Sequence, residues 1–167
     1  MITPSWVRMM AAYNAEMNRR LYTAASRLPE SERTLDRGAF WGSIHGTLAH
    51  LLWGDRMWMS RFAGWPKPQQ RQRDSAGIEP DFAALSRARV AADAAIVAWA
   101  ATLDPAWLAG ELVWHSGSTG SEQRRSCAVL VTHFFNHQTH HRGQAHAMLT
   151  AAGQVTGDTD LIVLVPG

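Results

Sequence analysis

The sequence predicts an all-α protein, namely a four-helix bundle with a short hairpin or loop before its last helix. Four segments of about 20 to 27 residues carry apolar side chains at alternating spacings of three and four, as in packed helices. Loops containing proline, glycine and polar residues separate these segments. Long helices with one apolar stripe each bury it together in a bundle. We expect a single domain over residues 1–167, which is long enough to bury a substantial core.

The first helix is predicted over residues 3–28. Thr3 or Ser5 can cap it, and Pro4 suits a first-turn position. Asn14 is the polar member of its inward stripe, and it has two interpretations. It either fixes the helix register through a hydrogen bond or lines a polar site in the interior. The stripe comprises Val7, Met10, Asn14, Met17, Leu21, Ala24 and Leu28.

The second helix is predicted to follow a capping Ser43 and to reach about Ala63. Its apolar residues cover more than one face, so we expect it to be heavily buried. His50 lies in these apolar surroundings, one position before the line formed by Ile44, Leu48 and Leu51, and Asp55 falls on that line. His45, near the helix start, is expected to be exposed.

The third helix is predicted from a capping Asp81 to about Leu103, and its many alanines favour helix and close packing. The basic cluster at residues 71–73, in the loop before it, is interpreted as solvated surface. Residues 112–125 are expected to form a short hairpin or an extended loop. The apolar tail at residues 161–165 is predicted to be strand-like and to pack on the body or on a partner.

The last helix, predicted over about 126–152, contains four histidines within nine residues. His137 and His141 lie one turn apart on its inward stripe, where Cβ atoms are about 5–6 Å apart, so both rings can reach one metal ion. Alternatively, they are core histidines that hydrogen-bond to other side chains, since an unmatched buried polar group costs about 1–3 kcal/mol. His50 could join them only if the second helix lies beside the last. The full stripe is Cys127, Leu130, Phe134, His137, His141, Gln144, Met148 and Ala151.

Composition excludes several classes of function. The formal charge of +2 is too small to indicate nucleic-acid binding. The sequence also lacks a stripe of Lys and Arg interleaved with aromatic residues, which is typical of a nucleic-acid-binding surface. The single cysteine, Cys127, allows no intrachain disulfide and is expected to be a small buried side chain. No apolar run has the length needed to cross a membrane, and the N-terminus lacks a signal pattern. We therefore expect a cytoplasmic protein with neither nucleic-acid nor membrane partners.

Two stretches carry a resemblance to a known family. Residues 47–58 (TLAHLLWGDRMW) and 133–144 (HFFNHQTHHRGQ) closely resemble motifs of the DinB-like (damage-inducible) family of bacterial metal-binding bundles. Tyr13 and Asn14 with Asn18 in the first helix, and residues 157–161 in the tail, are similar as well. The resemblance covers nearly the whole chain, and the motif of the last helix is the specific one.

The resemblance implies a four-helix bundle of up-down-down-up connectivity. It also implies a divalent metal, commonly zinc or nickel, held by three histidines, which are His50, His137 and His141 in this sequence. Members of the family are often homodimers. Characterised relatives include thiol-dependent S-transferases and a maleylpyruvate isomerase that uses a low-molecular-weight thiol.

Three functional hypotheses follow from this reading. The first is a metal-dependent transferase that activates a small thiol, or water, for attack on a small-molecule substrate. Asn14, Asp55, His133 and Gln144 are candidates for supporting the ligands or contacting substrate. Arg142 could meet an anionic substrate, but the favoured interpretation is an exposed arginine. The second is a metal-dependent hydrolase, which is weakened because no general base such as the Glu of a His-Glu-x-x-His motif accompanies the pair. The third is a non-catalytic, stress-related dimer in which the metal only tightens the bundle.

Overall fold

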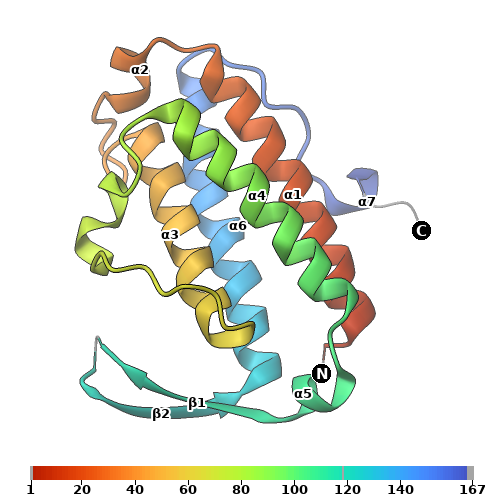
Figure 1. Cartoon of the computed structure of the whole chain (residues 1–167). Helices are drawn as coiled ribbons and strands as arrows, with labels where there is room; N and C mark the ends of the chain where they lie inside the picture. The colour runs from red at the N-terminus through yellow and green to blue at the C-terminus, as the bar shows by residue number, and fades with distance from the viewer. Residues whose placement is uncertain (1, 118, 165–167) are drawn as a thin grey trace.

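A computed structural model of the chain describes residues 2–117 and 119–164, and this part is mostly helical. Its four long helices are α1 (Pro4–Ser26), α3 (Ile44–Phe62), α4 (Phe82–Ala101) and α6 (Cys127–Ala151), close to the four predicted segments. They lie side by side (Figure 1), and α6 packs against α1 on one side and α3 on the other, while α4 contacts both α1 and α3. The second helix therefore lies beside the last, as a site that includes His50 requires.

Side-chain caps fix the start of three of these helices. The side chains of Thr3, Ser43 and Asp81 accept hydrogen bonds from the backbone N–H groups three residues further on, at 3.2, 3.0 and 2.6 Å. Each cap satisfies a backbone donor that the first helical turn leaves free. Just after the C-terminal end of α6, Gly153 has a φ of +76°. Glycine adopts this left-handed conformation without the steric cost of a Cβ.

The segment before α6 is a β-hairpin, so the chain is not purely helical. Strands β1 (Glu111–Ser116) and β2 (Ser121–Ser126) pair antiparallel, with Glu111 opposite Ser126. Leu112 and Trp114 on β1 pack against the apolar core, whereas β2 carries polar residues to solvent. The hairpin lies across the end of the molecule at which α6 begins (Figure 1).

Short helices interrupt the loops. They are α2 (Glu30–Thr34), the 3₁₀ helix η1 (Gln72–Gly77), α5 (Pro105–Ala109) and α7 (Leu161–Leu164). The prediction of a strand-like tail was wrong, because residues 161–164 form a helical turn and Ile162 is 88% exposed. The tail runs far from the β-hairpin (Figure 1), so no strand edge supplies the hydrogen bonds that a strand needs. Residue 165 of that prediction lies outside the described residues.

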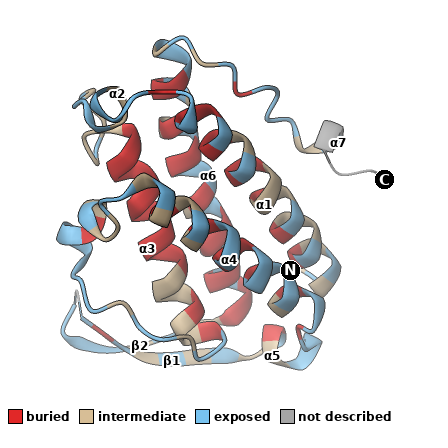
Figure 2. Ribbon diagram, turned by 45° about the horizontal axis from the view of Figure 1, so that its top comes forward, coloured by how far each residue is buried: buried red, intermediate tan, exposed pale blue. Residues whose placement is uncertain are grey.

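The interior contains charged groups as well as apolar ones, and Figure 2 shows buried positions along the inner faces of all four long helices. Arg89 of α4 is 2% exposed and forms ion pairs with Asp55 of α3, at 2.5 Å, and with Asp93, at 2.8 Å. Asn18 of α1 donates to Asp93 at 2.9 Å, and Gln138 of α6 donates to Asp55 at 2.7 Å. One polar network therefore connects α1, α3, α4 and α6. Among the described residues, no helix is both long and apolar enough to span a membrane.

Candidate metal centre

Three histidines converge between α3 and α6. His50 projects from α3, and His137 and His141 project from α6, with one potential ligand atom of each lying within 4.8 Å of the others. The ring centroids of His50 and His141 are 4.7 Å apart, and those of His137 and His141 are 4.6 Å apart. The packing of α3 against α6 therefore brings together side chains that are 87 residues apart in sequence.

Hydrogen bonds at Nδ1 of His50 and of His141 leave Nε2 of each ring free to act as a ligand atom. His50 Nδ1 lies 2.7 Å from the hydroxyl of Ser75, and His141 Nδ1 donates to Gln144 Oε1 at 2.8 Å. A histidine whose Nδ1 is engaged in this way presents Nε2 as the ligand atom. His50 Nε2 and His137 Nε2 are 3.2 Å apart. In a tetrahedral zinc site, two ligand nitrogens that each lie about 2.0–2.1 Å from the ion are about 3.3 Å from each other. The observed distance of 3.2 Å between the two Nε2 atoms therefore fits a shared ion.

Aromatic stacking fixes the plane of the His50 ring. Trp41 stacks on it with centroids 3.9 Å apart and an interplanar angle of 19°. Trp53 stacks on it at 5.9 Å and 24°. The indole of Trp53 donates to the carbonyl of Gln70 at 3.0 Å, so the stacking partner is itself held in place. His50 is 1% exposed and has little freedom to rotate.

The close approach of His137 depends on a glycine in α3. A Cβ on Gly54 would lie 2.9 Å from His137 Cε1, closer than side-chain carbons normally approach. Any other residue at this position would push the imidazole away from His50. Gly54 therefore creates the space that the His137 ring occupies.

The three imidazoles are held in their neutral form. Burial, followed by the proximity of His137 and His141, lowers the pKa of His50 to about 3. Burial, followed by the neighbouring histidines, lowers the pKa of His137 to about 4. Burial also lowers the pKa of His141, although its hydrogen bond with Gln144 acts in the opposite direction. Neutral imidazoles are the form that binds metal, so the cluster is ready for a cation at neutral pH.

These observations show that the residues present fit a metal ion. Two imidazole lone pairs at 3.2 Å repel each other unless a proton or a cation lies between them. The donor set of three histidine nitrogens suits zinc, nickel, copper or iron. Of the three residues, His50 and His141 are buried and His137 is partly exposed, so the cluster is most open to solvent at His137.

The other predicted site residues have different surroundings. Gln144 contacts His141, as a supporting role requires. His133 is exposed, with its ring 5.2 Å from Trp58 and 6.0 Å from His137, and it does not belong to the cluster. Asp55 is bonded to Arg89 and Gln138, and Asn14 accepts a hydrogen bond from Arg142.

Two expectations about exposure were wrong, and a third was confirmed. His45 is buried rather than exposed, because its Nε2 lies 2.7 Å from the carbonyl of Glu79 in the loop that covers the start of α3. Arg142 was expected on the surface but is 5% exposed, since it turns toward Asn14 of α1. Cys127 is buried as predicted.

Sequence reasoning missed Ser75, Trp41 and Gly54. Ser75 comes from the polar loop before α4, where nothing in the sequence distinguishes it from solvated serines. Trp41 lies in the loop before α3, and its stacking on His50 depends on the geometry of that loop. Gly54 carried a usable signal, because a glycine inside a buried helix often marks a close approach.

The fold and the cluster together define a mostly helical protein with a three-histidine candidate metal centre between two adjacent helices. The sequence model of the DinB family matches residues 1–164, so the chain belongs to the DinB family. Among solved structures, it is similar to a DinB-like protein from Bacillus cereus ATCC 10987, with a TM-score of 0.64 and 12% sequence identity. That similarity covers 85% of this chain and 89% of the other. No curated protein matched the sequence.

Proposed function

We propose that this protein is a metal-dependent transferase that activates a small thiol, or water, at a three-histidine centre. The observation that supports it is the convergence of His50, His137 and His141 within 4.8 Å, with no carboxylate or cysteine in the cluster. Three protein ligands leave at least one coordination position open, which is typical of catalytic rather than structural metal sites. The up-down-down-up bundle, the homodimer, the cytoplasmic location and the small-molecule substrate belong to the same proposal.

The chain's own residues would bind and orient the cation. His50, His137 and His141 would hold a divalent ion, with zinc or nickel the best candidates, and Ser75 and Gln144 would keep two of the rings aligned. Such an ion lowers the pKa of a thiol or water that it binds, so that the nucleophile forms at neutral pH. Trp41 and Trp53 both stack on the His50 ring, which is 1% exposed.

The distribution of carboxylates favours a thiol over water as the nucleophile. Asp55 lies on α3, as His50 does, and was a candidate for contacting the ligands or substrate. Its side chain is 1% exposed and is bonded to Arg89 and Gln138. It is therefore not free to accept a proton from an attacking water. A free thiol has a pKa of about 8.5, far below that of water, so it needs less help from a general base than water does.

Cobalt substitution tests this proposal directly. The cobalt(II) form of the full chain would be titrated with 2-mercaptoethanol while its near-ultraviolet spectrum is recorded. We expect a saturable sulfur-to-cobalt charge-transfer band that is missing from the His137→Ala variant. A pH titration of the visible spectrum with no response to thiol would support the hydrolase instead. No response to thiol or pH would favour the non-catalytic dimer and contradict the transferase.

A further inference from the structure

A cavity lies between α1, α6 and the C-terminal segment at residues 153–160, away from the face of α6 that packs on α3. Its volume is about 160 Å³. No member of the histidine cluster lines it, so it is separate from the metal centre. Its lining consists of Tyr13, Met17, Arg20 and Leu21 of α1, Thr139, Arg142, Gly143 and His146 of α6, and Thr156 and Thr159.

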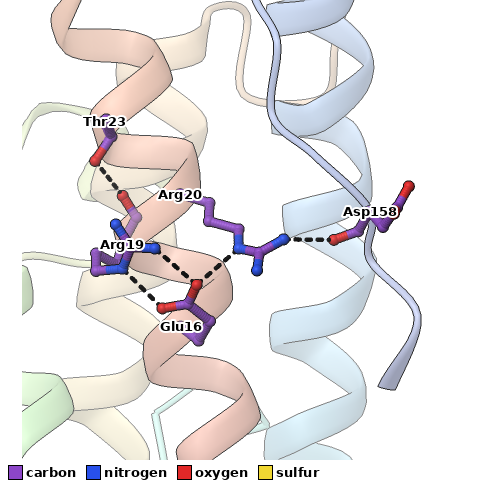
Figure 3. A network of polar contacts seen from close by, with 5 residues as sticks. All are labelled: Glu16, Arg19, Arg20, Thr23 and Asp158. Carbon is purple, nitrogen blue, oxygen red and sulfur yellow. Dashed lines mark hydrogen bonds and ion pairs between the residues drawn. The ribbon is translucent and has the colours of Figure 1, made fainter. Parts of the chain in front are cut away.

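Hydrogen bonds tie the C-terminal segment across this cavity. Tyr13 donates to the carbonyl of Thr159 at 2.7 Å, and Arg20 donates to the carbonyl of Asp158 at 3.1 Å. Figure 3 shows Arg20 reaching from α1 to this segment while also contacting Glu16. On the α6 side, His146 Nδ1 lies 2.9 Å from the hydroxyl of Thr156. Because both helices bind the segment, it forms a fixed wall of the cavity.

The cavity contains a buried cation with neutral partners. Arg142 is 5% exposed, and its guanidinium donates to Asn14 Oδ1 and to Thr139 Oγ1, the latter at 3.2 Å. Its centre lies 5.5 Å from the Tyr13 ring. Within the described part of the chain, no carboxylate lies within ion-pair distance of Arg142. The buried charge is therefore not neutralised by an ion pair.

Hydrogen-bond donors exceed acceptors around this guanidinium. An arginine side chain has five N–H groups, and among the described residues those of Arg142 have two side-chain acceptors, Asn14 and Thr139. Asn14 is fully buried, and its Nδ2 has no acceptor. Burial lowers the pKa of Arg142 to about 10, so the group stays charged at neutral pH. An anion would supply both the missing acceptors and the missing charge.

The rest of the lining suits an apolar group. Met17, Leu21 and the Tyr13 ring come from α1 and provide apolar surface. A cavity of about 150 Å³ can hold a benzene ring, so the volume fits a compact hydrocarbon body. Arg20 also lines the cavity but is already paired with Glu16, which leaves Arg142 as the unpaired charge for a ligand.

We propose that this cavity binds a small monocarboxylate with a compact apolar body. The carboxylate would accept from the guanidinium of Arg142, and the body would lie against Met17 and Leu21. A planar carboxylate matches the forked N–H geometry of arginine. A single unpaired guanidinium beside apolar side chains favours a singly charged carboxylate over a phosphate.

Calorimetry of the full chain with benzoate tests this proposal, with benzamide as the neutral analogue of the same shape. We expect benzoate to bind with one site per chain and about tenfold or more tightly than benzamide, since the guanidinium favours the charged form. The His137→Ala variant should bind benzoate unchanged, because the metal centre is a different site. Equal binding of the two probes, no binding at millimolar concentrations, or loss of binding in His137→Ala would overturn the proposal.

Two variants test the cavity itself. Arg142→Gln removes the charge and should weaken benzoate binding by about tenfold or more, whereas Arg87→Gln, on the exposed side of α4, should have no effect. A Cβ at Gly143 would meet no atom within 4 Å, so Gly143→Leu can fill the cavity while Arg142 remains. It should abolish binding with the helical circular dichroism retained. Full binding in both Arg142→Gln and Gly143→Leu would place benzoate elsewhere and refute the assignment.

Discussion

Each imidazole of the centre is positioned by a different kind of contact. His50 is stacked against two indoles, His141 is hydrogen-bonded to Gln144, and His137 fits into the space left by Gly54. A ligand ring that is fixed before the ion arrives loses less freedom on binding. The arrangement of the centre therefore depends on side chains that do not themselves donate to an ion.

Gly54→Ala should weaken metal binding by about tenfold or more, the effect typical of disturbing residues that support metal ligands. The new Cβ would lie 2.9 Å from the end of the His137 side chain, which can rotate away, so the protein should still fold. Competition with a chromophoric chelator measures the change. Gly143→Ala, on α6 with open space around its Cβ, is the control and should bind metal like the parent. Parental affinity in Gly54→Ala would show that His137 needs no such space.

The lowered pKa values predict a pH dependence of stability for the metal-free protein. The pKa of His137 is about 4 in the folded chain because of burial, and about 6.5 when unfolded. Between these values the unfolded state binds the proton and the folded state does not, so stability falls as the pH drops below about 6.5.

Urea unfolding of the parent and His137→Gln in chelator, at about pH 7.5 and about pH 5, measures the contribution of His137, including its effect on the pKa of His50. Relative to the variant, the parent should lose about 1–2 kcal/mol at the lower pH, allowing for partial exposure of the ring. Burial raises the pKa of Asp93 to about 6, which acts in the opposite direction, but it does so in both proteins. A difference between the two proteins that does not change with pH would contradict the assignment.

At the scale of elements, the ion pairs of Arg89 with Asp55 and Asp93 form the centre of the polar network that joins the four long helices. Asp55→Asn should lower the free energy of unfolding by about 3–5 kcal/mol, the cost of removing one partner of a buried pair. The loss should lie toward the lower end because Asp93 remains paired with Arg89. Urea unfolding measures it.

The control for this substitution is Glu79→Gln. Glu79 pairs with Arg56 at 3.7 Å, and both side chains are about one-third exposed, so the change should be below about 1 kcal/mol. Asp55→Asn should also retain its metal when folded, because Asp55 bonds to Arg89 and not to a histidine of the cluster. Loss of metal without loss of stability would show instead that Asp55 supports the centre.

The elements could be predicted from sequence because periodicity and caps are local signals. The apolar stripes located the four helices, and Thr3, Ser43 and Asp81 marked three of their starts. The His137–His141 pair was visible in the same way, since both lie on one stripe. His50 could be joined to them only through the family resemblance, because spacing within one helix carries no information about which helices are neighbours.

Other features depend on contacts that sequence periodicity does not encode. His45 and Arg142 were both expected to be exposed. His45 is instead covered by a loop, and Arg142 packs against α1, where it donates to Asn14. Ser75 and Trp41 come from irregular segments whose path is set by tertiary packing. The tail lacked a strand partner, and its short apolar run did not reveal this.

At the scale of the whole molecule, α6 contributes residues to the candidate metal centre on one face and to the proposed carboxylate site on another. One face carries His137 and His141 toward α3, and the other carries Arg142 and Gly143 toward α1 and the C-terminal segment. The metal centre joins α3 to α6, and the proposed carboxylate site joins α1 to α6. A cation bound between α3 and α6 should also stabilise the folded chain, because the unfolded chain presents no preformed site.

Metal analysis of the purified protein tests the central claim most directly. We expect about one divalent ion per chain in the parent, as three convergent histidines would hold. The variants His50→Ala, His137→Ala and His141→Ala should each lose most of it, while His133→Ala, outside the cluster, should retain it. Full metal content in both His50→Ala and His137→Ala, with the proteins folded, would contradict the account.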